Sequence, residues 1–178
     1  MMSFFQKGSV DQISFYKVTT KFANVLKNDT SFDNLQLTGH SLGGGLAIIS
    51  SAQSGVPSVA LSGPNAMLMG QSFEPQVFPD ALNKYTFNIV PDYDIVPHFD
   101  DLAKNYQKIR CLVEPYAFLS CHDYVRSLCE IVTTCGNGNR PAICECVYEY
   151  NYPVPNATGG NDEVTFEEAC KRNGYSKD

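Results

Sequence analysis

The sequence lacks the two apolar features that would assign it to a membrane or an export route. No apolar run approaches the roughly 18 residues that are needed to span a bilayer. The first residues, Met1 to Lys7, lack the apolar stretch of a secretory signal. We therefore expect no transmembrane segment, and by this test alone the chain resembles a cytosolic protein.

The chain also lacks a basic stripe or a Lys/Arg-rich segment. Its 178 residues hold 13 Lys and Arg against 19 Asp and Glu, a formal net charge of −6. Because binding to phosphates requires clustered positive charge, a nucleic-acid partner is disfavoured. The 43% of hydrophobic residues argues against disorder and favours one globular domain.

Cysteine is absent from the first 110 residues and dense after them, at Cys111, Cys121, Cys129, Cys135, Cys144, Cys146 and Cys170. Three interpretations are open: disulfides, reduced thiols, or a zinc site. A zinc ribbon or finger needs a Cys-x-x-Cys pair, in which two residues separate the cysteines, and no such pair is present. A dense block beside loops rich in Gly, Pro and Asn favours disulfides, and the odd count leaves one sulfur free or paired outside this chain.

Disulfide pairing cannot be deduced from the sequence. Proximity suggests Cys111 with Cys121 and Cys129 with Cys135, but the second pair would span most of two helical turns, too far if both ends are helical. Asn-x-Thr sequons at Asn28 and Asn156 are a further, weak feature of the secretory route.

Hydrophobic periodicity predicts alternating helices and strands. A helix over 11–27, with Asp11 as N-cap, carries one apolar face formed by Phe15, Val18, Phe22, Val25 and Leu26. Strands are predicted over 34–38, 57–61 and 84–90, and helices over 42–54, 123–135 and near 164–172. Residues 66–83 are expected to be irregular and to cover the core. This order predicts an α/β fold with a mostly parallel sheet and flanking helices.

Residues 39 to 45 read Gly-His-Ser-Leu-Gly-Gly-Gly, between a predicted strand and a predicted helix. This Gly-x-Ser-x-Gly pattern is typical of a nucleophile elbow, in which Gly39 and Gly43 leave room for a sharp turn that exposes the Ser41 hydroxyl. The competing interpretation is a Gly-rich turn with a surface serine.

A serine nucleophile needs a base and an orienting carboxylate. His40 is adjacent to Ser41 and points away from it, which leaves His98 and His122 as candidate bases. The strand over 84–90 delivers Asp92 and Asp94 to the sheet edge that carries the elbow. The order Ser41, Asp94, His122 is the order expected for an α/β-hydrolase.

These residues carry a family resemblance. Gly-His-Ser-Leu-Gly-Gly at 39–44, with Asp94-Ile95-Val96-Pro97-His98, resembles the class 3 (fungal, Rhizomucor-type) lipases, whose catalytic Asp heads such an Asp-Ile-Val-Pro segment. The cysteine-histidine pair at 121–122, followed by Leu-Cys-Glu at 128–130 and Cys-Gly at 135–136, is similar to lipase-like proteins from protists, where that His completes the triad.

The resemblance implies a catalytic triad of Ser41, Asp94 rather than Asp92, and His122, and gives His98 a structural place. It covers residues 11 to 136, so we expect a lipase-like domain over 1–136 and a Cys-containing, loop-rich extension over 137–178. The backbone N–H of Leu42, the residue after the nucleophile, would serve as one oxyanion donor.

The departure from the family is at the N-terminus, where only 38 residues precede Gly39. Family members carry far more residues there, which hold the first strands, the lid and the second oxyanion donor. Loss of one such donor costs on the order of 10²–10³ in kcat. We therefore expect a partial α/β-hydrolase fold in which the nucleophile strand, 35–38, becomes an exposed sheet edge.

The leading functional hypothesis is a serine ester hydrolase that acts on acylglycerol or related lipid esters at a lipid–water interface, without metal or organic cofactor. The alternatives are a catalytically silent remnant with a binding role, and acyl transfer, phospholipase or peptidase-like chemistry on the same triad. The resemblance implies a secreted or endolysosomal location for the full-length protein. Chain-length preference and oligomeric state are not set by the sequence.

Overall fold

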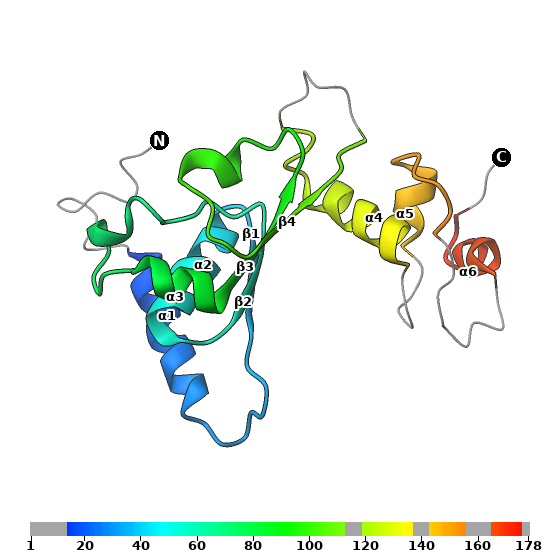
Figure 1. Cartoon of the computed structure of the whole chain (residues 1–178). Coiled ribbons are helices and arrows are strands. Elements are labelled where there is room, and N and C mark those ends of the chain that lie inside the picture. The colour runs from blue at the N-terminus through cyan, green and yellow to red at the C-terminus, as the bar shows by residue number, and fades with distance from the viewer. Residues whose placement is uncertain (1–13, 113–118, 137–142, 156–164, 176–178) are drawn as a thin grey trace. The chain divides into compact units, whose positions relative to one another are not determined.

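The computed structural model describes residues 14–112, 119–136, 143–155 and 165–175 (Figure 1). The chain divides into two compact units, Met1–Lys108 and Ile109–Asp178, whose relative position is not determined. The boundary predicted at residue 136 was placed where the family resemblance ends, not where contacts divide the chain. It stays a prediction. Within the described ranges, no helix is long and apolar enough to cross a membrane.

Unit 1 is built on an all-parallel sheet of four strands, which confirms the predicted α/β class and the parallel sheet. The strands lie in the order of the sequence: β1 (Leu37–His40), β2 (Ser58–Leu61), β3 (Thr86–Pro91) and β4 (Tyr106–Ile109). In this register His40 lies beside Leu61, and Leu61 beside Ile89. Among the described strands, β1 has one neighbour, so the nucleophile strand is a sheet edge, as expected.

Helix α2 (Leu42–Ser54) is the centre of unit 1. It packs against β1 and β2, while α1 (Phe15–Lys27) and α3 (Pro79–Tyr85) pack against α2 (Figure 1). The buried hydrophobic cluster joins these elements and consists of Ile48, Ile49, Ala60, Ala66, Phe73, Val77, Leu82 and Ala103. Helix α2 ends as predicted at Gly55, whose φ of 71° gives the left-handed C-cap that glycine adopts without strain.

The two faces of the sheet are covered unequally. Alternate residues such as Ser58, Ala60 and Asn88 are buried, whereas Val59 is half-buried and Phe87 is 38% exposed. Parallel sheets normally carry helices on both faces, because both faces are apolar. In unit 1 the described helices bury one face well and leave the other partly open.

Unit 2 is held together by three disulfides, which confirms the preference for disulfides over thiols or zinc. Its helices are α4 (Tyr124–Cys135), α5 (Cys144–Tyr148) and α6 (Phe166–Arg172). The pairs are Cys111–Cys121, Cys129–Cys146 and Cys144–Cys170. The suggested pair of Cys129 with Cys135 is wrong, because both residues lie in α4 and Cys129 bonds to α5.

The helix ends in unit 2 follow local signals in the sequence. Asp123 caps α4 by accepting a hydrogen bond from the backbone N–H of Val125 at 2.9 Å, and Gly136 is its C-cap. The predicted helix near 164–172 is α6, which begins with a capping box between Thr165 and Glu168. The predicted N-cap at Asp11 and the sequon at Asn156 lie outside the described residues.

Helix α1 buries the face opposite to the one predicted. The apolar stripe, defined here as Phe15, Val18, Phe22 and Val25, is 58–71% exposed. Thr20 and Ala23 are buried instead, because the small Ala23 lets α1 approach α2 and Thr20 donates a hydrogen bond to Gln53 at 2.8 Å. Tertiary packing therefore overrides the amphipathic pattern, and the predicted core face of this helix is wrong.

Residues 66–83 were expected to be irregular and outside the core, and this too is wrong in part. They include the short 3₁₀ helix η2 (Gly70–Ser72) and most of α3, and they contribute Phe73 and the fully buried Leu82 to the core. Pro79 is at the first turn of α3, where its missing N–H is tolerated, so it begins a helix. Strand β3 accordingly starts at Thr86, and β4 and α5 were not predicted.

The reversed face of α1 gives a stability prediction. We expect Phe22→Ala to change the free energy of unfolding by less than about 1 kcal/mol, because Phe22 is 62% exposed. The matched truncation Leu82→Ala, at a residue that is 0% exposed, should cost about 2–5 kcal/mol. Urea unfolding followed by circular dichroism measures both. If Phe22→Ala lowered the free energy of unfolding as much as Leu82→Ala does, the packing described for α1 would be contradicted.

Candidate active site

Ser41 occupies the strained turn between β1 and α2. Its φ of 56° and ψ of −124° lie in a region that residues other than glycine rarely adopt. The turn is fixed on both sides, because Ser41 N–H donates to Leu61 O at 3.0 Å and Ser41 O accepts from Gly45 N–H at 3.0 Å. The Ser41 side chain does not cap the helix and is partly exposed. This is the strand–turn–helix setting that a nucleophile elbow requires.

The glycines around Ser41 have unequal roles. A Cβ at Gly39 would collide with the backbone of Gly43 and lie 2.8 Å from Gly44 N. A Cβ at Gly44 would lie 2.8 Å from Gly63 Cα, in the segment after β2. A Cβ at Gly43 would meet nothing within 4 Å. The steric requirement therefore holds for Gly39 and Gly44, and the reason given from the sequence for Gly43 does not hold.

The first turn of α2 supplies the candidate oxyanion donor. Leu42 is the first residue of this helix, so its N–H has no acceptor within the helix by position. The partial positive charge of the helix N-terminus adds to the donor strength of that N–H. The Leu42 side chain is 56% exposed, which leaves the first turn at the surface of unit 1.

Of the two candidate acids, the structure buries only Asp94. Asp94 is 2% exposed and follows β3 by three residues, whereas Asp92 is exposed. Asp94 Oδ1 accepts a hydrogen bond from Val96 N–H at 2.9 Å, which fixes the carboxylate in its loop. Tyr93, between the two acids, has a φ of 65° and turns the chain. A buried, fixed carboxylate is the type that orients an imidazole.

Ser41 and Asp94 lie at the same end of the sheet, where its parallel strands terminate. Both follow the carboxyl ends of parallel strands, and β2 separates β1 from β3. Neighbouring strands are about 4.8 Å apart, so the ends of β1 and β3 are about 10 Å apart. An imidazole hydrogen-bonded on both sides spans a gap of this order between a serine and a carboxylate.

The three histidines have different settings. His40 lies within β1, and His98 is exposed in the 3₁₀ helix η3 (Val96–Phe99). His122 is partly buried and belongs to unit 2. Because the relative position of the two units is not determined, its distance to Ser41 and Asp94 is not defined. His122 follows Cys121, whose disulfide to Cys111 ties the His122 loop to the segment that leaves β4.

Two buried polar groups in the loops that follow the strands were not predicted from the sequence. Asp100 is 6% exposed, and its carboxylate accepts hydrogen bonds from Leu68 N–H at 2.8 Å and Met69 N–H at 3.1 Å. Ser62 directly follows β2 and has a φ of 54°, and its hydroxyl is buried with no hydrogen-bond partner among the described residues. The segment Ser-Gly-Pro-Asn at 62–65 signals a turn, but no local pattern signals the role of Asp100.

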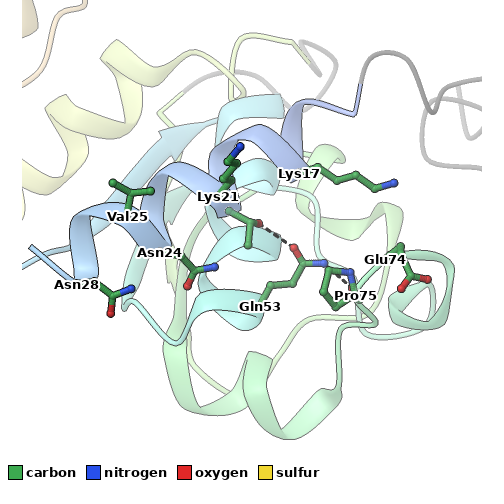
Figure 2. A pocket seen from close by; sticks show the side chains of 9 residues that line it. Lys17, Lys21, Asn24, Val25, Asn28, Gln53, Glu74 and Pro75 are labelled. Atoms are coloured by element: carbon green, nitrogen blue, oxygen red, sulfur yellow. Dashed lines mark hydrogen bonds between the residues drawn. The ribbon is translucent and has the colours of Figure 1, made fainter.

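A hollow of about 570 Å³ lies elsewhere in unit 1, between α1 and the segment at Glu74–Pro75 (Figure 2). Lys17, Lys21 and Val25 line it from α1, and Gln53 from α2. It contains neither Ser41 nor Asp94, so it is not the candidate active site. In the described part of the chain, no group of three or more His, Cys, Asp or Glu side chains could hold a metal ion.

The unequal glycines give a second prediction. We expect Gly39→Ala to cost about 3 kcal/mol of unfolding free energy, because its methyl group would overlap backbone that cannot move aside. Gly43→Ala should be neutral or stabilise by up to about 1 kcal/mol, because alanine favours the helix. Urea unfolding of the two variants tests this, and equal losses would contradict the assigned contacts.

Comparison with known proteins does not assign the chain to a family. No protein-family model matches the sequence, and no curated protein matches it at a significant level. The lipase resemblance therefore rests on the quoted motifs, and the setting of Ser41 and Asp94 is the structural observation that bears on function.

Proposed function

We propose that this protein is a serine hydrolase that cleaves carboxylic esters of lipids. The observation that carries the proposal is the setting of Ser41: a strained residue between a parallel strand and a helix N-terminus. That conformation costs on the order of 1–3 kcal/mol, and a surface turn has no need of it at a serine. A nucleophile does, because the turn lifts the hydroxyl out of the sheet.

In the proposed reaction, Ser41 Oγ attacks the acyl carbonyl and His122 takes the proton from Oγ. Asp94 holds the imidazolium, and the Leu42 N–H donates to the oxyanion. His122 then returns the proton to the leaving alcohol, and water repeats the sequence to release the acid. One preorganised oxyanion donor contributes about 2.7–4 kcal/mol to transition-state stabilisation, and the Leu42 N–H is the donor that we assign to this role.

Exposed apolar side chains at the end of the sheet that carries Ser41 support a lipid substrate. Leu42 is 56% exposed, Tyr93 54% and Ile95 48%, and all three follow the carboxyl ends of β1 or β3. Exposed apolar side chains at the carboxyl ends of the strands are the type that would contact an acyl chain or a lipid phase. The charge of −6 does not favour an anionic polymer as the alternative substrate.

The disulfides support a location in an oxidising compartment. Three pairs in one unit are unusual for a cytosolic protein and typical of secreted or lumenal proteins. Because Cys121 is one of the paired residues, oxidation also constrains the loop that carries the proposed base, His122. We therefore propose that activity requires the oxidised chain.

The first test is covalent labelling with a fluorophosphonate probe. We expect the probe to label Ser41 and labelling to disappear in Ser41→Ala. The matched control is Ser62→Ala, because Ser62 also directly follows a strand and has a positive φ, but its hydroxyl is buried. Mass spectrometry identifies the labelled peptide, and labelling that persists in Ser41→Ala would exclude the nucleophile.

The second test separates the candidate acids and bases by hydrolysis of a short p-nitrophenyl ester. Asp94→Asn should lower kcat by on the order of 10⁴, because the imidazole loses its orientation. Asp92→Asn, at an exposed residue two positions away, should retain most activity. His122→Ala should abolish turnover and His98→Ala should leave some.

The alternative function is a catalytically silent protein, favoured by the partly open sheet face around Phe87 in unit 1. Folded, oxidised protein that hydrolyses the ester no faster than Ser41→Ala would establish this alternative and exclude the hydrolase. Transfer to an alcohol or amine in preference to water would instead assign the same triad to acyl transfer.

A further inference from the structure

Unit 2 contains a hollow of its own that no part of the proposed reaction uses. It lies between α5 and α6 and has a volume of about 280 Å³, close to the lower limit of the range for small-molecule sites, about 300 Å³. It is lined by Val147, Tyr148, Val154, Phe166, Glu167, Lys171 and Tyr175.

The walls of this hollow are fixed by covalent and backbone bonds. The disulfide between Cys144 and Cys170, both buried, joins the first turn of α5 to α6. After α6, Gly174 has a φ of 87°, and Tyr175 N–H donates back to Cys170 O at 3.0 Å. Tyr175 is thereby held against the helix that carries Phe166 and Lys171, so little ordering is left for a ligand to impose.

Three aromatic rings, together with Val147 and Val154, form the apolar part of the lining. The rings of Tyr148 and Tyr175 have centroids 5.7 Å apart and are tilted by 42°, and Phe166 begins α6. The Tyr175 hydroxyl is hydrogen-bonded to the Glu145 carboxylate, and this bond, with nearby Glu149, raises the pKa of Tyr175. A hydroxyl that donates to a carboxylate leaves its ring richer in electrons. Such rings attract quaternary ammonium groups.

The charged part of the lining carries both signs. Glu167 and Lys171 are four residues apart on α6, so they lie on one face of the helix and both line the hollow. Glu145 and Glu149 add negative charge behind Tyr175. A simple anion would be repelled by this acidic side, and an uncharged apolar ligand would desolvate Glu167 and Lys171 without compensation.

We propose that this hollow binds a zwitterion made of a quaternary ammonium and a phosphate, the chemistry of a phosphocholine group. The ammonium lies against the tyrosine rings on the side of Glu167, and the phosphate faces Lys171. Such a group occurs as a free metabolite and as a lipid headgroup, and both present the same charges to the site. The proposal does not rest on the proposed hydrolase function.

The experiment is a calorimetric titration of the oxidised Ser41→Ala chain with soluble phosphocholine, choline and inorganic phosphate. Cation–π contacts in a preformed site predict a dissociation constant on the order of 1 mM or below for phosphocholine. Choline should bind more weakly, and phosphate should give no measurable heat. Use of Ser41→Ala separates this result from hydrolysis, so either proposal can fail alone.

Variants assign the binding to the named side chains. Tyr148→Leu should weaken phosphocholine about tenfold, and Tyr148→Phe should retain binding because the ring remains. Lys171→Gln should remove the preference for phosphocholine over choline. The matched control Arg172→Gln changes the neighbouring charge, which does not line the hollow, and should leave affinity unchanged. Near-ultraviolet circular dichroism confirms that each variant is folded.

Vesicles of phosphatidylcholine distinguish the two sources of the group. Co-sedimentation that is lost in Tyr148→Leu assigns the hollow to a lipid headgroup, whereas binding of soluble phosphocholine alone assigns it to a free ligand. Binding to neither, or binding that both Tyr148→Leu and Lys171→Gln leave unchanged, overturns the proposal.

Discussion

The first turn of α2 lies directly against the backbone that follows β1 and β2, with no side chain between them. Gly39, Gly44 and Gly63 permit this approach, because a Cβ at any of them would lie within 3 Å of neighbouring backbone. The contact brings the helix N-terminus to the ends of the strands, and Ser41 lies at this junction with its φ of 56°. Close packing of backbone therefore holds α2 tightly against the sheet, and it also positions Ser41, the proposed nucleophile, at the junction of β1 and α2.

Unit 1 combines this tight centre with surfaces that are apolar or incompletely paired. The apolar stripe of α1, the second face of the sheet around Phe87 and the β1 edge are all accessible among the described residues. A parallel sheet obtains much of its stability from two helical layers, so the single layer described here stabilises the sheet from one side. Stability in unit 1 is therefore concentrated where α2 packs against its neighbours, with Ile48 of α2 and Leu82 of α3 fully buried.

The elements that could be predicted from the sequence are those with local signals at both ends. Gly55 ends α2, Asp123 begins α4, and the Gly-x-Ser-x-Gly pattern places Ser41 at a strand–helix junction. Features that depend on distant partners could not be predicted in this way. The buried face of α1 is set by its fit to α2, and the partner of Cys129 is set by where α5 lies. Asp94 was identified, whereas Asp100 was not, because its partners lie some 30 residues earlier.

The disulfides have a consequence for how the protein is produced and handled. All seven cysteines lie beyond residue 110, so no covalent link within this chain joins unit 1 to unit 2 except the backbone. The redox history of a preparation therefore acts on one unit only. Protein made in a reducing host would retain the β1–α2 junction but lack the covalent links of unit 2, so an assay of Ser41 on such material would report on unit 1 alone.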